Sequence, residues 1–386
     1  MKIPLSAPDV QEEEIELVAG VLRTPHLSLG PKLAEFEHAV AEYVGTENAI
    51  GVSSGTAGLH LCVRAMGIGA GDEVIVPSFA FIAVANVLRY ENAIPVFVDI
   101  EAETLNLDAS RIEAAVTPRT KAILVVHTFG CPAGMSEILD IARRHHLYVI
   151  EDACEAIGAE YENRKVGGLG EAGVFGFYPN KQITTGEGGV VVTRNPRLAP
   201  VIRALRNQGR ASSEDWFQHS EVGYNYRLSE MSCALGIGQM KRIETILSRR
   251  EEIARKYSAR LKGNKNLRLP ALALPNRRIS WFVYAVRLSE RYSQVHRDWI
   301  VQEMKRRGIG CGRYFAPIHL QPAYQGAVVR KTDLRITETE ASRCLALPFF
   351  NRLQDEQIDE VCENFHELIR LAGGLAAMKI KNRCIV

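Results

Sequence analysis

Lys181 lies in the stretch FGFYPNKQITTGEGG (175–189), between a compact aromatic run and a group of small and hydroxyl residues. No acidic residue occurs within five positions on either side, so the sequence offers this lysine no local ion-pair partner. Apolar neighbours would let the side chain enter a packed pocket, where loss of water disfavours the charged ammonium and frees a lone pair. Such an amine attacks a carbonyl carbon, whereas a lysine in an ordinary surface turn stays solvated.

The stretch SSGTAGLHLCVRAM (53–66) has small and hydroxyl residues followed by an apolar-periodic run. The run predicts a helix, and the free backbone amides at a helix N-terminus bind phosphate. The hydroxyls of Ser54 and Thr56 and the unhindered Gly55 would complete such a receptacle. The same residues would also make an ordinary helix cap, so the stretch alone leaves both interpretations open.

VIEDACEAIGA (149–159) places Glu151 and Asp152 at the carboxyl end of an apolar strand. Ligands of open α/β sheets bind outside such strand ends, where a carboxylate can pair with a cationic group. A solvated strand end is the alternative. Phosphate receptacle, carboxylate and amine together match the phosphate, basic ring nitrogen and aldehyde of one small molecule, pyridoxal 5′-phosphate (PLP). The sequence therefore predicts PLP as the cofactor.

GLGEAG (168–173) matches the glycine fingerprint G-x-G-x-x-G of dinucleotide-binding sites. That motif binds a pyrophosphate only where it joins a strand to a helix. Here the polar residues NRKVG precede it and the strand-like VFGFYP follows. We expect a glycine-rich loop that enters a strand, and no dinucleotide site.

These motifs are set among short apolar runs rich in β-branched residues, which alternate with helical patterns. Near-continuous apolarity is typical of strands covered on both faces. Helices are expected at 110–120 and 137–146, where apolar residues recur at helical spacing. The alternation predicts an α/β fold with a mostly parallel sheet. The expected strands are 72–77, 95–99, 121–127, 147–152, 173–179 and 188–193.

The pattern changes after about residue 235. A long, charged amphipathic helix is expected over 237–261, followed by a strand at 281–288 and helices at 293–308 and 355–374. We therefore expect a large PLP-binding domain and a smaller α/β domain. Their predicted bounds are 1–239 and 240–386, with 376–386 as a loose end.

The chain has 386 residues, with 47 basic and 45 acidic side chains and a net charge of +2. This balance gives no overall field that would attract nucleic acid or an anionic membrane. There is no apolar run long enough to span a bilayer, and the start lacks the layout of a signal peptide. The eight cysteines are scattered without a C-x-x-C pair, which is typical of reduced thiols. We expect a cytoplasmic protein without a metal site.

At these residues the chain resembles the DegT family of nucleotide-sugar aminotransferases, which are fold type I PLP enzymes. The resemblance runs over nearly the whole chain, from LSLGPKLAEFE (27–37) through the motifs above and GYNYRLSE to FAPIHLQPAY (315–324). The motifs occur in family order and at family-like spacing. The resemblance implies a fold type I PLP-dependent transferase, with a large domain around a mostly parallel sheet and a smaller C-terminal α/β domain.

The resemblance also implies roles for individual residues. Lys181 would join PLP through an imine bond and later move protons. Asp152 would pair with the ring nitrogen and keep it protonated, so that the ring accepts electrons. Gly55, Thr56 and Ala57 would hold the phosphate.

Other positions follow the family pattern less simply. Phe81 would lie against the ring, and Asn225, in GYNYR, resembles a residue that the neighbouring subunit contributes to the phosphate site. Glu155 would stand beside the cofactor's phenolic oxygen, where many members of the family have glutamine. Gly176 replaces a common serine, so one phosphate contact is absent. His319 resembles a position near the sugar site, although a lone histidine is more often structural.

The activity implied is transfer of the amino group of L-glutamate to a keto-deoxy sugar linked to a nucleoside diphosphate, by a homodimer with shared active sites. One alternative is a keto-cyclitol aminotransferase. A PLP-dependent sugar dehydratase is disfavoured because related dehydratases have histidine in place of Lys181. A non-catalytic PLP-binding regulatory protein is a further alternative. The nucleotide (dTDP, UDP or GDP) stays open, and NKQITTGEGG with Glu155 leans toward 4-amination of a GDP sugar, as in perosamine synthases.

Overall fold

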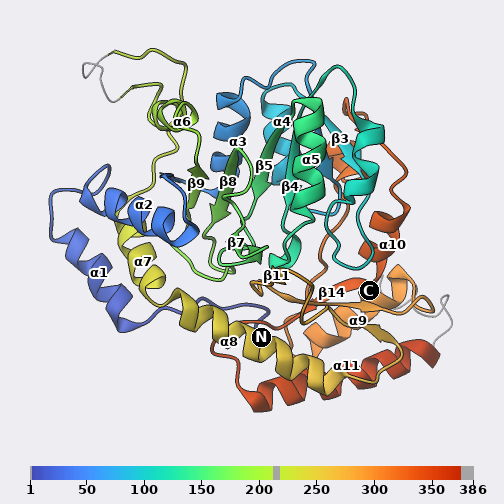
Figure 1. Cartoon of the computed structure of the whole chain (residues 1–386). Helices are drawn as coiled ribbons and strands as arrows, with labels where there is room; N and C mark the ends of the chain where they lie inside the picture. The colour runs from blue at the N-terminus through green and yellow to red at the C-terminus, as the bar shows by residue number, and fades with distance from the viewer. Residues whose placement is uncertain (1, 212–217, 375–386) are drawn as a thin grey trace.

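Figure 1 shows the computed structural model of the protein, which describes residues 2–211 and 218–374. Its largest sheet has eight strands in the order β1-β9-β8-β5-β4-β2-β3-β13. β9 runs antiparallel to both of its neighbours, and all pairs from β8 to β13 are parallel. The predicted α/β fold with a mostly parallel sheet is confirmed. The strands are β1 (Asn48–Val52), β2 (Glu73–Pro77), β3 (Ile94–Val98), β4 (Thr120–Val126), β5 (Tyr148–Asp152), β8 (Ala172–Gly176), β9 (Gly189–Thr193) and β13 (Arg330–Lys331).

Helices cover both faces of this sheet, because its strands are apolar on both sides. On β2, Val74 and Val76 face one layer and Ile75 faces the other, as the two-residue period of a strand requires. One layer contains α3 (Gly55–Ala65), α4 (Ala83–Tyr90) and α6 (Leu198–Arg206). The other contains α2 (Pro31–Val44), α5 (Met135–His145) and α7 (Glu230–Lys241), and α1 (Glu12–Leu22) lies beside α7 (Figure 1).

A second apolar core lies below the large sheet in Figure 1. It is built around a three-stranded sheet in the order β10-β12-β14. Its elements are α8 (Ile243–Leu261), β10 (Leu267–Arg268), β12 (Tyr284–Leu288), α9 (Gln294–Arg306), β14 (Cys344–Leu347) and α11 (Asp355–Gly374). α10 (Arg335–Arg343) packs beside α9 and β12. A small sheet of β6 (Glu160–Tyr161), β7 (Arg164–Lys165) and β11 (Arg277–Arg278) lies between the two parts.

The chain passes between the two cores more than once. Ile3 packs in the second core, whereas Ile318 and Tyr324 pack in the apolar layer between the large sheet and α3, α4 and α6. β13 adds to the large sheet by pairing with β3. The division between residues 239 and 240 remains a prediction, and the expected loose end at 376–386 is outside the described residues.

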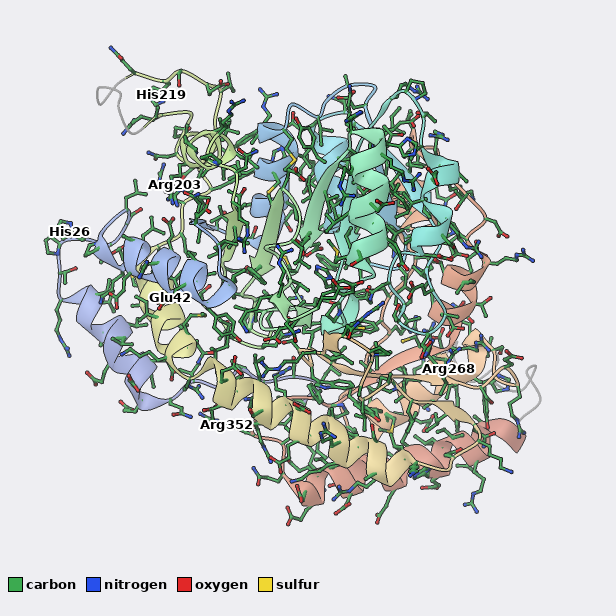
Figure 2. All side chains as sticks on the ribbon, viewed as in Figure 1. His26, Glu42, Arg203, His219, Arg268 and Arg352 are labelled. Carbon is green, nitrogen blue, oxygen red and sulfur yellow. The ribbon has the colours of Figure 1, made fainter. Side chains whose placement is uncertain are left out.

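The helix expected over 237–261 is two helices that meet at Arg242. The Nε of Arg242 donates to Glu14 Oε1 at 2.6 Å, and its Nη1 donates to Asp9 Oδ2 at 2.9 Å. Asp9 also accepts from Arg352 Nε at 2.9 Å, which ties the N-terminal segment to the second core. Figure 2 labels Arg352, next to α8. α8 buries a stripe of residues along one side, whereas α7 buries five consecutive residues from Gly236 to Met240. Because buried residues continue on both sides of Arg242, periodicity alone could not locate the break.

The helix expected at 110–120 is absent. Two short 3₁₀ turns, Ala109–Arg111 and Glu113–Ala115, take its place. Asp108 caps the first turn through its side chain, and Pro118 could not continue a helix. The apolar residues there recur at helical spacing without forming a full helical turn.

Candidate active site

A cavity of about 620 Å³ lies at the carboxyl ends of β1, β2, β4, β5 and β8. These ends meet at one edge of the sheet because the five strands run in the same direction, which is where α/β sheets bind ligands. Two segments from the second half of the chain, at Phe282 and at residues 313–315, close the far side of the cavity. The lining residues are Ser54, Gly55, Thr56, Leu59, Phe81, Ala83, Val126, Asp152, Cys154, Glu155, Gly176, Phe177, Tyr178, Asn180, Lys181, Glu187, Gly188, Phe282, Arg313, Tyr314 and Phe315.

Lys181 lines this cavity with 16% of its side chain exposed. Its Nζ lies 3.4 Å from Glu155 Oε1 and 4.2 Å from the centroid of the Phe282 ring. The next residue, Gln182, fixes the loop, because its Nε2 donates to the backbone oxygens of Glu155 at 2.6 Å and of Ser280 at 3.0 Å. The amine is therefore held in a partly apolar pocket and not in a solvated turn.

Glu155 is the acid that the sequence around the lysine lacks, and it comes from the loop after β5. Its Oε2 accepts from the backbone N–H of Phe129 at 3.0 Å. Burial raises the pKa of Glu155, and the nearby Lys181 ammonium and the Phe129 amide oppose this shift. A carboxyl group with a raised pKa can hold a proton for a neighbouring oxygen atom, which an ionised carboxylate cannot do.

Asp152 and Glu151 are adjacent but face opposite sides of β5. Asp152 lines the cavity, and its Oδ1 accepts from the backbone N–H of Cys154 at 3.1 Å. Glu151 is fully buried on the other side, where its Oε2 is 2.9 Å from His127 Nε2. Of the two carboxylates at this strand end, only Asp152 can meet a ligand in the cavity.

Glu151 also fixes the conformation of the glycine-rich loop at 168–173. Its two carboxylate oxygens accept from the backbone N–H groups of Gly167, Leu169 and Gly170, each at 2.7 Å. Burial acts to raise the pKa of Glu151, but the His127 contact and the loop amides lower it below its ordinary value. The GLGEAG segment therefore wraps around a carboxylate of the chain itself and enters β8, which confirms the expected loop.

The N-terminus of α3 faces the cavity through Gly55 and Thr56. Ser54 caps the helix: its Oγ accepts from the Ala57 amide at 3.0 Å, and Ala57 is not among the cavity-lining residues. A Cβ at Gly55 would lie 2.6 Å from Cys154 Sγ, and one at Gly176 would lie 3.2 Å from it. Cys154, which sequence reasoning missed, thus fills the space beside both glycines.

Three predicted residues lie differently with respect to the cavity. Phe81 lines it and is 60% exposed. Asn225 is exposed and does not line the cavity of its own chain. His319 is buried away from the cavity, with Nδ1 2.7 Å from Ser78 Oγ and Nε2 3.1 Å from Glu338 Oε1. The geometry gives His319 a structural setting, and its role near a sugar stays a prediction.

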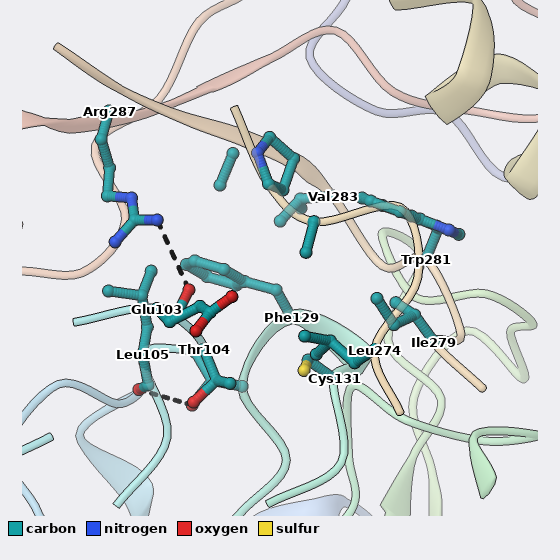
Figure 3. A pocket seen from close by; sticks show the side chains of 14 residues that line it. Glu103, Thr104, Leu105, Phe129, Cys131, Leu274, Ile279, Trp281, Val283 and Arg287 are labelled. Carbon is teal, nitrogen blue, oxygen red and sulfur yellow. Dashed lines mark hydrogen bonds between the residues drawn. The ribbon is translucent and has the colours of Figure 1, made fainter. Parts of the chain in front are cut away.

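Aromatic residues that sequence reasoning also missed form the far wall. Phe315 lines the cavity and stacks on Phe129, with ring centroids 5.3 Å apart. A smaller cavity of about 50 Å³ lies beyond Phe129 (Figure 3). There Thr128 Oγ1 donates to the backbone oxygen of Leu105 at 3.3 Å. Phe282, Tyr314 and Phe315 form this wall, and the stacking of Phe315 on Phe129 joins the C-terminal half of the chain to the loop after β4, next to Glu155.

The groups around the larger cavity fit the predicted PLP. The amine of Lys181, the carboxylate of Asp152 and the helix start at Gly55 and Thr56 line one space. Asn180 also lines it, and its buried Oδ1 has no hydrogen-bond partner among the described residues. A buried acceptor without a partner is costly unless a ligand or water satisfies it. The cavity can thus receive a molecule with a phosphate, a basic ring nitrogen and an aldehyde.

The model of the DegT/DnrJ/EryC1/StrS aminotransferase family matches residues 8–366. The chain is 42% identical over 364 residues to GDP-perosamine synthase of Caulobacter vibrioides, a match that covers 93% of this chain and 96% of the relative. Its structure is similar to Helicobacter pylori PseC, an aminotransferase of pseudoaminic acid biosynthesis, with a TM-score of 0.92, 28% identity and coverage of 96% and 100%. The PLP form of Streptococcus pneumoniae Spr1654 gives a TM-score of 0.91 at 26% identity, with coverage of 96% and 100%. The chain therefore belongs to the DegT/DnrJ/EryC1/StrS aminotransferase family and is a PLP-dependent transaminase.

Proposed function

We propose that this transaminase moves the amino group of L-glutamate onto a keto-deoxy sugar linked to a nucleoside diphosphate. The products are 2-oxoglutarate and an amino sugar for polysaccharide or glycoside biosynthesis. The observation that carries the proposal is the Lys181 amine, enclosed beside Glu155 in the cavity that Asp152 also lines. The 42% identity to a GDP-perosamine synthase supports a nucleotide sugar as acceptor and favours a GDP sugar.

Lys181 and Asp152 would carry the chemistry. When bound, PLP supplies an aldehyde that captures amines and a ring that accepts electrons from the substrate carbon. Lys181 Nζ would hold the cofactor covalently until a donor amine displaces it, and would then carry a proton from one carbon atom to the other. Asp152 would keep the ring nitrogen protonated, because a nearby negative charge favours the cationic form.

The other cavity residues would position the cofactor. The start of α3, at Gly55, Thr56 and Ala57, would hold the phosphate through the helix N-terminus. Phe81 would cover one face of the ring. Glu155, with its raised pKa, would hold a proton at the phenolic oxygen.

We also propose a homodimer in which the two active sites are shared. Asn225 is exposed and lies outside the cavity of its own chain, which supports a contact with the phosphate of the neighbouring subunit. Phe81 and Tyr178 line the cavity with 60% and 52% of their surface exposed, and Val222, near Asn225, is 79% exposed. Burying such apolar surface against a second copy would favour association.

Mixed dimers test the shared sites. Lys181→Ala chains combined with an equal amount of Asn225→Ala chains should regain about a quarter of wild-type activity, because a twofold dimer of the two variants has one intact site and half of all dimers are mixed. Activity is assayed at a PLP concentration that leaves the Asn225→Ala protein largely empty.

The matched control combines Lys181→Ala with Asp152→Asn chains. Both residues line the cavity of the same chain, so each mixed dimer would have one defect in each site and no activity would return. Equal recovery in the two mixtures, or recovery in neither, would contradict shared sites through Asn225.

The acceptor is tested with L-glutamate and a panel of keto-deoxy sugars carrying dTDP, UDP or GDP, with a keto-cyclitol as comparison. We expect loss of the yellow colour on adding glutamate, and a mass change on a nucleotide sugar that corresponds to replacement of the keto oxygen by an amino group. A product from the cyclitol alone would replace the sugar assignment. A protein whose colour responds to glutamate but which aminates no panel member would refute the proposed acceptor class.

The cellular setting is a separate proposal. No helix in the described part of the chain combines the length and apolarity needed to cross a membrane. The cysteines in that part, at positions 62, 131, 154, 233, 311, 344 and 362, are all free thiols. Free thiols support a cytoplasmic location, because disulfides are rare where the medium is reducing.

A further inference from the structure

A partly buried polar cluster outside the cavity joins α3 to the segment that carries Asn225. We call it the His60 cluster, and its members are His60 on α3, Glu91 at the end of α4, Tyr224 and Tyr226. None of the four lines the active-site cavity. Its residues therefore have no direct part in the chemistry described above.

The cluster is tightly bonded. His60 is 4% exposed, with Nε2 2.7 Å from Glu91 Oε1 and Nδ1 3.1 Å from the Tyr226 hydroxyl. The Tyr224 hydroxyl donates to the same Glu91 oxygen at 3.0 Å. Arg64, one turn after His60, adds a weaker contact to Glu91 Oε2 at 3.4 Å. A carboxylate that accepts several bonds in a largely buried setting holds its donors firmly.

Ring packing fixes the same two tyrosines. Tyr224 and Tyr226 stack with centroids 5.0 Å apart and planes 12° apart, and the His60 ring lies 4.8 Å from that of Tyr224. Both tyrosines turn to α3, so the residue between them, Asn225, is directed away and is exposed. The backbone is held as well, since the Ser53 N–H donates to the Tyr226 carbonyl at 2.9 Å.

We propose that the His60 cluster positions Asn225 for the PLP phosphate of the neighbouring subunit. The inference rests on the proposed shared sites and extends them. α3 starts at Gly55 and Thr56, where the phosphate in the cavity of the same subunit would bind. His60, in the second turn of α3, would hold Asn225 in place for the cavity of the neighbouring subunit. The backbone here is already held by bonds from Tyr224 and Tyr226 to the end of α6 and by a bridge between Asn225 and Asn207. The cluster adds the side-chain anchors on both sides of Asn225, without which its side chain would have to be ordered further on binding, at a cost in affinity.

Glu91→Gln and Tyr226→Phe test the cluster in the full-length dimer. Glu91→Gln removes the negative charge to which His60 and Tyr224 bond, Tyr226→Phe removes the bond to His60 Nδ1, and both leave the cavity intact. We expect PLP to bind about 10-fold more weakly to each variant, as for loss of one charged or buried hydrogen bond. Pyridoxal, which lacks the phosphate, should bind with unchanged affinity. Both dissociation constants are read from visible absorbance, with the dimer verified by light scattering.

Two controls separate positioning from general stability. Tyr43→Phe removes a comparable tyrosine–carboxylate bond, to Glu244 at 2.6 Å, and should leave both affinities unchanged. Combining Glu91→Gln with Asn225→Ala should weaken PLP binding no further than Asn225→Ala alone, since the cluster would act through that residue.

Several outcomes would overturn the positioning role. They are unchanged PLP affinity in both variants, an equal loss for PLP and pyridoxal, fully additive effects with Asn225→Ala, or loss of the dimer in both variants. The proposed function fails in a different way, namely if the wild-type protein itself does not bind PLP covalently at Lys181.

Discussion

Replacing Lys181 with alanine should abolish both turnover and covalent attachment of the cofactor. The amine would serve twice, as the group that bonds the cofactor and as the base that moves the proton, so both contributions are lost together. General acid–base catalysis alone is worth about 10²- to 10⁴-fold, and we expect a fall in kcat of at least about 10⁴-fold. The yellow colour should be absent, and borohydride reduction followed by digestion should label no peptide.

Lys165→Ala is the matched control. Lys165 is also a partly shielded lysine, with 21% of its side chain exposed, an ion pair to Glu160 at 3.1 Å and the Tyr43 ring 4.3 Å away. It does not line the cavity, so its replacement should leave colour and kcat essentially unchanged. A borohydride label on Lys165 or on any peptide other than the one containing residue 181 would disprove the role given to Lys181.

The enclosed setting of this lysine could be predicted from sequence because it depends on local composition. Apolar residues before Lys181 and small residues after it are properties of one stretch, and they indicated a packed pocket correctly. The acid beside the amine could not be read in this way, because Glu155 is 26 positions away and meets Lys181 only through the parallel pairing of β5 and β8.

The far wall of the cavity was beyond sequence reasoning for a related reason. Phe282, Tyr314 and Phe315 lie more than a hundred positions after Lys181, and ordinary aromatic residues carry no signal of which cavity they will face. In the sequence Cys154 is one of eight scattered cysteines, and its position beside Gly55 and Gly176 appears only from the distances in the structure. Long-range packing decides such positions, whereas strand and helix periodicity follow from local spacing.

The second large prediction concerns Glu151 and Asp152, the adjacent acids at the end of β5. Their position at the strand end does not by itself distinguish their roles. Asp152→Asn should lower kcat by about 10²- to 10⁴-fold, since removing one partner of a buried charge pair costs about 3–5 kcal/mol. The melting temperature should hardly change, because an asparagine Oδ1 can still accept from the Cys154 amide. The measurements are kcat at saturating PLP and thermal unfolding.

Glu151→Gln should instead lower the stability of the fold and leave kcat nearly unchanged. Four donors converge on the two oxygens of Glu151, from His127, Gly167, Leu169 and Gly170. A glutamine amide would turn an NH₂ group toward some of them, and we expect a loss of about 2–4 kcal/mol in the free energy of unfolding. Among the molecules that remain folded, kcat should be close to that of wild type, because the side chain faces away from the cavity.

The pH dependence of this loss has a definite sign. The folded protein holds the pKa of Glu151 below its ordinary value of 4.5, so the unfolded chain binds the proton more tightly than the folded one does. The carboxylate's contribution is therefore complete at neutral pH and disappears as the pH falls below 4.5 through the lower, folded-state pKa. The stability gap between wild type and Glu151→Gln should be widest near neutrality and close in acid. A gap that widens in acid, or a Glu151→Gln protein that keeps its stability but loses kcat, would reverse the roles assigned to these two neighbours.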